Sequence, residues 1–137
     1  MAYWLLKTEP EAWSWDQQKM RGKKGEPWSG VRNYQAANNM KAMRHGDLGF
    51  FYHSGEERRI MGIVEVVKEY HPDPTDELGR FGMVDVKAVE DFRNPVTLSQ
   101  IRADSSLSDM VLVKNSRLSV QPVTPREWQI ICRAGGL

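Results

Sequence analysis

The stretch LGFFYHSGEERRIMGIVEVVKEY, residues 48–70, predicts a β-hairpin at the centre of the fold. Its first part, 48–54, and its last part, 60–70, are rich in the aromatic and β-branched residues that favour strands. The five residues between them, GEERR, are polar and begin with glycine, as turns often do. We therefore expect two neighbouring strands joined by a short turn.

Further strands are expected on both sides of this hairpin. The run AYWLLK at 2–7 is aromatic and aliphatic, as strands are. GMVDVKAV, at 82–89, alternates apolar and charged residues, which is the pattern of a half-buried strand. RLSVQPV, at 117–123, predicts a last strand ended by Pro122. Two prolines and an acidic cluster mark HPDPTDELGR, at 71–80, as a loop.

Short helices are indicated by capping residues, whose side chains accept hydrogen bonds from the free N–H groups of a first helical turn. The predicted N-caps are Ser14, Asn33, Thr97, Ser106 and Thr124. The predicted closing glycines are Gly22, Gly46 and Gly135, and the helix after Asn33 is expected over about 34–44. Five or six strands with four or five short helices indicate an α+β domain with a mixed, barrel-like sheet.

Composition limits the classes of function. The 137 residues suit a single domain over 1–137, and 19 basic against 18 acidic residues leave a net charge of +1. The chain has no large overall positive charge of the kind that indicates a nucleic-acid binder, so an anion site has to be local. A single cysteine, Cys132, excludes an internal disulfide and multi-cysteine zinc sites, and the three histidines lie far apart. We expect no metal, no membrane association and a cytoplasmic location.

Catalytic motifs are poorly represented. His53 and Ser54 are neighbours, and neighbours on a strand point to opposite faces, so they cannot pair by themselves. The glycine-rich run at 22–30 lacks the residue order of a phosphate-binding loop. Cys132 follows Trp128 by four residues in the last predicted helix and is interpreted as a small core residue. We expect a non-enzymatic protein without a cofactor.

Binding chemistry is better represented, at strand ends and at one helix entrance. The helix after Asn33 presents a partial positive charge at its N-terminus, and Arg32 would strengthen an anion site there. Trp28, in the preceding loop, either covers the core or offers a flat face for stacking. The basic loop at 19–24 is either a solvated face or a track for a nucleic-acid backbone.

A resemblance to a known family extends along the chain. YWLLKTEP, WSGVRNYQA, GDLGFFYHS, GIVEVV, YHPDPT, MVDVK and SRLSVQPVT occur in the same order as in the EVE domain family, between Tyr3 and about Ile131. That family includes thymocyte nuclear protein-like members and many small bacterial proteins. The resemblance implies a single PUA-like domain, a β-barrel with short flanking helices, related to YTH and ASCH domains. It also implies that the protein recognises a modified base, which would be a modified cytosine in DNA or a modified base in RNA.

The resemblance implies roles for individual residues. Trp28 would stack on the base, with Tyr34 or Tyr52 on the other side, and Lys7 and Thr8 would occupy places that match a YTH pocket. The whole predicted ligand-binding set is Lys7, Thr8, Ser14, Trp28, Arg32, Asn33, Tyr34, Gln35, Asn38, Tyr52, His53, Ser54, Arg117 and Ser119. Within it, Asn33, His53 and Ser54 would read the polar edge, and Arg32, Arg117 and Ser119 would hold phosphate. Plainer roles stay open, because Asn33 can cap, Tyr34 can pack and Arg117 can pair with a carboxylate.

Two positions depart from the family pattern. Ala37 stands where relatives often carry arginine, which removes one potential phosphate or helix-surface contact. Phe81 stands near the place before MVDVK where a tryptophan is common, so stacking there is expected to be weaker or differently placed.

Three hypotheses follow from these patterns. The first is a non-enzymatic module whose partner is a nucleic acid carrying a modified base, bound beside Trp28. The second is a small ASCH-like hydrolase or nucleoside-processing enzyme, in which Lys7, Glu9 and His53 would have to converge on one pocket. The third is a protein-interaction domain with a vestigial pocket.

Overall fold

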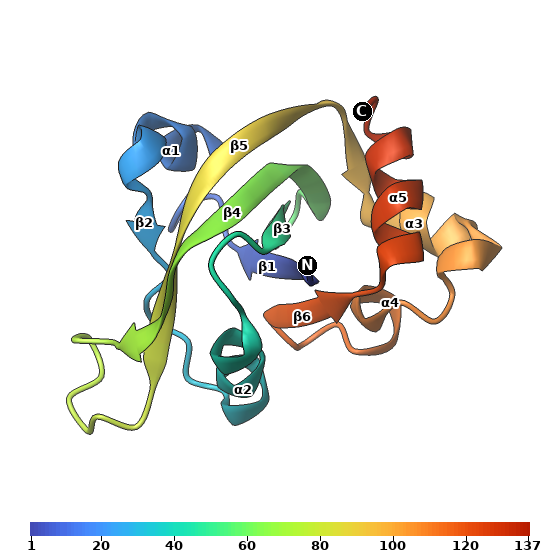
Figure 1. The fold of residues 1–137 in the computed structure, drawn as a ribbon. Coiled ribbons are helices and arrows are strands. Elements are labelled where there is room, and N and C mark those ends of the chain that lie inside the picture. Colours follow the sequence, from blue (N-terminus) through green and yellow to red (C-terminus); the bar gives the residue numbers. More distant parts are fainter.

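A computed structural model describes residues 1–137 and contains one mixed six-stranded sheet in the order β2-β5-β4-β3-β1-β6 (Figure 1). The strands are β1 (Tyr3–Thr8), β2 (Glu26–Pro27), β3 (Leu48–His53), β4 (Arg59–Pro72), β5 (Gly82–Thr97) and β6 (Val120–Val123). β1 and β3 run parallel, and every other pair is antiparallel. The predicted central hairpin is confirmed as β3 and β4, and the α+β class is confirmed.

The sheet is not closed into the expected barrel. Its two edges are β2, which pairs only with β5, and β6, which pairs only with β1. Both edge strands are short and contain proline, which has no N–H to donate to a further strand. The sheet therefore ends at both sides. Pro122 lies within β6, so the expectation that this proline ends the strand was wrong.

The hairpin of β4 and β5 is longer than the sequence pattern indicated. β4 continues through Pro72, and β5 continues through Thr97, beyond the alternating run at 82–89. Four register shifts interrupt the pairing of the two strands. Such irregularities bend and twist a strand pair, and the hairpin arches over the rest of the sheet (Figure 1). The residues added to the strands do not alternate regularly, so their periodicity carried no strand signal.

The helices are α1 (Trp15–Met20), α2 (Tyr34–Ala42), α3 (Leu98–Ala103), α4 (Val111–Lys114) and α5 (Pro125–Ala134). The predicted capping boxes that start at Ser14, Thr97 and Thr124 are all present. Asn33 caps α2, with its side-chain oxygen accepting from the Ala36 N–H at 2.9 Å. Gly135 follows the end of α5, as predicted.

Three predicted helix boundaries were wrong. α1 ends before Arg21, and Gly22 instead begins a single 3₁₀ turn, η1 (Gly22–Lys24). α2 ends at Ala42 with Met43 at its C-cap, because the chain turns into an extended conformation there, ahead of Gly46. No helix starts at Ser106, which lies within a second 3₁₀ turn, η2 (Ser105–Leu107), where its N–H donates to the Asp104 carboxylate.

The core lies on both faces of the sheet, because successive strand residues point to opposite sides. Trp4, Leu6 and Phe51 pack on the face covered by α1 and α2. Leu5 and Phe50 pack on the other face, under α3, α4 and α5 (Figure 1). Cys132 packs at the margin of this second cluster, and burial raises the pKa of its thiol to about 11. None of the helices has the length and apolar character needed to cross a lipid bilayer.

Candidate functional site

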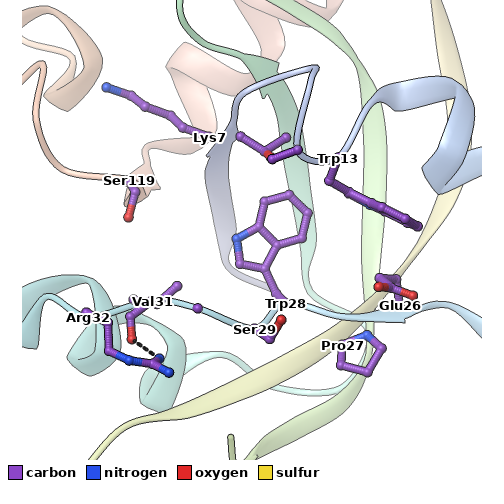
Figure 2. Close-up of a pocket in the computed structure, with 12 residues that line it drawn as sticks. Lys7, Trp13, Glu26, Pro27, Trp28, Ser29, Val31, Arg32 and Ser119 are labelled. Carbon is purple, nitrogen blue, oxygen red and sulfur yellow. Dashed lines mark hydrogen bonds between the residues drawn. The ribbon is translucent and has the colours of Figure 1, made fainter. Parts of the chain in front are cut away.

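A cavity of about 390 Å³ opens where β1 ends, on the face covered by α1 and α2. Its walls come from the end of β1, the turn before α1, β2 with the segment that follows it, and the residue before β6 (Figure 2). The lining residues are Lys7, Thr8, Ala12, Trp13, Glu26, Pro27, Trp28, Ser29, Gly30, Val31, Arg32 and Ser119. Five of them, Lys7, Thr8, Trp28, Arg32 and Ser119, belong to the predicted binding set.

Trp28 belongs to the core, which is one of its two predicted roles, and it also lines this cavity. Its side chain is 7% exposed and meets the Phe51 ring edge to face, with centroids 5.6 Å apart. Its backbone N–H donates to the Val84 carbonyl at 2.7 Å, which ties the segment to β5.

The indole N–H of Trp28 has no hydrogen-bond partner in the protein. The indoles of Trp4, Trp13 and Trp15 each donate to a side-chain oxygen. The single fully enclosed side-chain polar atom without a partner is Oε1 of Gln121, so the Trp28 nitrogen is accessible. In Figure 2 this nitrogen is turned toward the side where Ser119 lies. A free donor thus faces the cavity from an aromatic ring.

Trp13 is the aromatic wall that sequence reasoning missed. Its indole nitrogen donates to Oε1 of Gln18 at 2.9 Å, and Nε2 of this buried glutamine donates to the Val86 carbonyl at 3.0 Å. The ring is thereby fixed beside Trp28 (Figure 2). Its position directly before the N-cap Ser14 was an available signal, because an apolar residue there often packs against the helix it precedes.

Arg32 lines the cavity, but its charge is compensated. Its Nη1 lies 3.2 Å from Oδ2 of Asp73, and Nη2 donates to the Thr75 hydroxyl at 2.9 Å. Burial disfavours the charged form of Asp73, yet hydrogen bonds from Thr75, the Gly30 N–H and Arg32 together lower the pKa of this carboxyl to about 2. Figure 2 shows the guanidinium next to the Val31 carbonyl, which accepts from Nη1 at 3.0 Å.

Lys7 points away from the Trp28 cavity. Its Nζ donates to the Ser116 carbonyl at 2.7 Å, and burial lowers the pKa of the ammonium group. Its backbone N–H donates to the Ser119 carbonyl at 2.8 Å, which places Ser119 at the cavity. Lys7 therefore shapes the wall, whereas the hydroxyl-bearing residues Thr8, Ser29 and Ser119 supply polar lining.

The other predicted residues of the α1 and α2 entrances lie outside the cavity. Ser14 and Asn33 act as helix caps. The exposed Tyr34 ring lies 4.8 Å from the Phe81 ring, so Phe81 supports Tyr34 and does not reach the Trp28 cavity. Gln35 and Asn38 are exposed on α2, whereas Ala37 is buried. Position 37 is therefore a packing position, which corrects its interpretation as a helix-surface contact.

His53 is engaged in structural hydrogen bonds. Its Nε2 accepts from the Trp15 N–H at 3.0 Å, so the ring proton lies on Nδ1, which donates to Glu57 Oε1 at 2.8 Å. The hydrogen bond from His53 lowers the pKa of Glu57. Glu9 is exposed and Lys7 is bonded to Ser116, so Lys7, Glu9 and His53 do not converge on one pocket.

Tyr52 and Ser54 line a different cavity, and the exposed Arg117 lines neither. Tyr52 belongs to the core cluster on the α5 side of the sheet, whereas Trp28 belongs to the cluster on the α2 side. No group of three or more His, Cys, Asp or Glu side chains gathers at a possible metal position.

Comparison with known proteins places these features in a family. A family model described as the EVE domain matches residues 2–134. Thymocyte nuclear protein 1 of Gallus gallus is 36% identical to this chain, and the match covers 94% of this chain and 66% of that protein. The chain thus spans slightly less than two thirds of that relative's length.

Solved structures agree with this result. Rpa0253 of Rhodopseudomonas palustris is 54% identical, with a TM-score of 0.94 over 99% of this chain and 94% of its own. The human THYN1 protein, in complex with DNA that contains 5-methylcytosine, is 31% identical, with a TM-score of 0.94 over 100% and 99%. The Mmi1 YTH domain, 12% identical with a TM-score of 0.58 over 97% and 86%, shares the fold alone. Because the family model and these structures match almost the whole chain, the protein belongs to the EVE domain family.

Proposed function

We propose that this protein binds nucleic acid and holds a modified base in the cavity beside Trp28. The observation that carries the proposal is the Trp28 indole, whose ring lines an open cavity and whose N–H has no partner in the protein. Membership in the EVE family adds support, since a family member, the human THYN1 protein, has been solved with 5-methylcytosine-containing DNA.

The cavity has the chemical variety that recognition of a base requires. A base that leaves its stack is held by an aromatic face and by hydrogen bonds to its polar edge. Trp28 and Trp13 supply aromatic surface, and Pro27 and Val31 supply apolar surface suited to a methyl substituent. The carboxylate of Glu26, which pairs with Arg21 at 3.1 Å, is an acceptor for an exocyclic amino group such as that of cytosine.

The proposed ligand class is a modified cytosine in DNA or a modified base in RNA. Stacking of a base on an aromatic ring contributes about 1 to 3 kcal/mol and tolerates any base. Discrimination of the modification therefore has to come from the apolar surface and from donors such as the Trp28 N–H.

Fluorescence titrations test the proposal with single-stranded and duplex oligonucleotides that differ at one base. The panel holds cytosine, 5-methylcytosine, 5-hydroxymethylcytosine and modified adenine and uracil in DNA and RNA, at one stated salt concentration. We expect preference for at least one modified base. Trp28→Ala should weaken binding of that oligonucleotide by about 1 to 3 kcal/mol, the value of one stacking contact.

Two further variants separate binding from folding. Trp28→Phe keeps an aromatic ring in the core but removes the N–H, so it should stay folded and lose part of the preference. Tyr34→Ala changes an exposed aromatic residue outside the cavity and should bind as the wild type does. Indifference of the wild-type protein to every modification would refute the proposal.

A further inference from the structure

A second cavity, of about 290 Å³, lies beside the ends of β1 and β3, next to α3 and the segment after α4. It opens among Lys7, Tyr52, Ser54, Arg58, Arg102 and Ser116. The Trp28 cavity lies next to it, and Lys7 lines both. The second cavity is not part of the aromatic site, so its own chemistry needs an explanation.

Cations line this cavity and no carboxylate does. Lys7, Arg58 and Arg102 contribute to its wall, and none of the three takes part in an ion pair. Arg58 and Arg102 also line a separate cavity together with Glu56 and Glu57. Neither glutamate forms an ion pair with these arginines, and Glu57 pairs with His53 and Arg59. In a chain with a net charge of +1, this is a local excess of positive charge.

Tyr52 adds an unpartnered donor to the same cavity. Its side chain is 3% exposed, and its hydroxyl makes no hydrogen bond within the protein. Since Gln121 Oε1 is the single fully enclosed side-chain polar atom without a partner, the Tyr52 hydroxyl is accessible at the cavity. Burial raises the pKa of Tyr52, and the charges of Arg58 and Arg102 oppose that rise, so both guanidinium groups act on this hydroxyl.

The backbone holds Arg58 in an unusual conformation. Its φ of 46° makes it the one residue other than glycine with a positive φ in the chain. The Arg58 carbonyl accepts from the Leu98 N–H at 2.8 Å, which attaches the turn to the start of α3. A non-glycine residue in the left-handed region is uncommon and is enriched at functional sites. This turn and α3 together bring Arg58 and Arg102 to one cavity.

We propose that this second cavity binds a backbone phosphate of the nucleic acid whose base occupies the Trp28 cavity. The inference rests on the proposed function. Arg58 and Arg102 supply charge-assisted hydrogen bonds, and the Tyr52 hydroxyl donates a third. This assignment differs from the expectation that Arg32, Arg117 and Ser119 hold phosphate. Asp73 compensates Arg32, and Arg117 lines neither cavity. Ser119 lines the Trp28 cavity only.

The test compares two double variants of the full chain that lose the same charge. The first variant, Arg58→Gln with Arg102→Gln, removes both arginines from the lining of the second cavity. The second variant, Arg126→Gln with Arg133→Gln, removes two exposed charges from α5. Binding of single-stranded oligonucleotides with cytosine or 5-methylcytosine is measured at about 50 to 200 mM salt, over which phosphate contacts weaken strongly.

We expect the cavity variant to bind both oligonucleotides more weakly by the same factor, and the α5 variant to bind as the wild type does. The slope of log K against log salt should become shallower by about 0.7 for the loss of one phosphate contact on a single strand. Preference for the modified base should persist, because the Trp28 cavity is unchanged.

The outcomes separate this inference from the proposed function. Unchanged affinity and slope in the cavity variant, with intact base preference, overturn the phosphate site alone. A shallower slope without any base preference in the wild type supports a phosphate site and overturns base reading. Equal losses in both double variants overturn the phosphate site, since they show a diffuse charge effect. Failure of the wild type to bind any oligonucleotide overturns both.

Discussion

Nη1 of Arg32 lies 3.2 Å from Oδ2 of Asp73, a carboxylate whose side chain is completely buried. The same Oδ2 accepts from the Gly30 N–H at 2.8 Å, and Oδ1 accepts from the N–H and hydroxyl of Thr75. Asp73 therefore joins the cavity segment after Trp28 to the loop between β4 and β5. This pairing fixes one wall of the cavity and occupies the arginine nearest to it.

Asp73→Asn should destabilise the protein. A neutral amide has one acceptor oxygen, so it cannot replace all the bonds of the buried carboxylate, and Arg32 loses its counter-charge. We expect a decrease of about 2 to 3 kcal/mol in the free energy of unfolding, measured by urea denaturation. Asp109→Asn, which removes an exposed ion pair with Lys114, should change it by less than about 1 kcal/mol. Equal effects of the two substitutions would contradict the role given to Asp73.

Asp73 should also make stability depend on pH in the acid range. Its pKa is about 2 in the folded protein and about 3.9 in an unfolded chain, so the unfolded state binds the proton first. The stabilisation is complete above pH 4 and is lost as the pH falls toward 2. The loss should be about 2 kcal/mol. Urea denaturation from pH 6 to pH 2 measures it, and the dependence should be weaker in Asp73→Asn than in the wild type.

Gln18→Leu should loosen the Trp13 wall of the cavity. The leucine cannot bridge the Trp13 indole and the Val86 carbonyl, so both lose a partner in a buried region. We expect a loss of about 1 to 3 kcal/mol in the free energy of unfolding. Weaker oligonucleotide binding should accompany it. Gln129→Leu, at an exposed position of α5, is the matched control and should leave both quantities unchanged.

Gly62→Ala should disturb the contact between α1 and the β4–β5 hairpin. A Cβ at position 62 would overlap the Trp15 ring and would lie 2.5 Å from the Glu90 carbonyl oxygen, and the backbone there has little room to move. We expect a loss of about 1 to 3 kcal/mol from overpacking. Gly49→Ala meets the flexible end of the Leu6 side chain first, at 2.7 Å, and should cost less. Thermal denaturation compares the two variants, and the opposite order would contradict this account.

Local patterns were sufficient for most elements of the fold. The capping boxes at Ser14, Thr97 and Thr124 involve residues three positions apart, so the sequence carries both halves of each interaction. The β3–β4 hairpin depends in the same way on two apolar runs and the turn between them. The open edges of the sheet were not predictable, because closure depends on how strands far apart in the chain meet.

The candidate site was likewise predictable only in part from the sequence. Trp28 was identified from the sequence, because family motifs mark it and because a tryptophan in a polar loop is chemically distinctive. Trp13 was missed, although its position before the N-cap Ser14 was a local signal. The contact that fixes its ring was not predictable, because Gln18 is itself held by Val86, 68 positions away. Tyr34 and Tyr52 were expected near Trp28 but lie outside its cavity.

The sequence by itself determined the α+β class, the family and the aromatic residue at the centre of the candidate site, because these depend on local periodicity and on motifs read in order. Only the tertiary structure decided which arginines lack an ion-pair partner. Arg32 lies next to the cavity but is compensated by Asp73, 41 positions later in the chain. Arg58 and Arg102 come together without a carboxylate at the second cavity. The electrostatic role of a side chain depends on neighbours in space, and folding brings these together from distant parts of the chain.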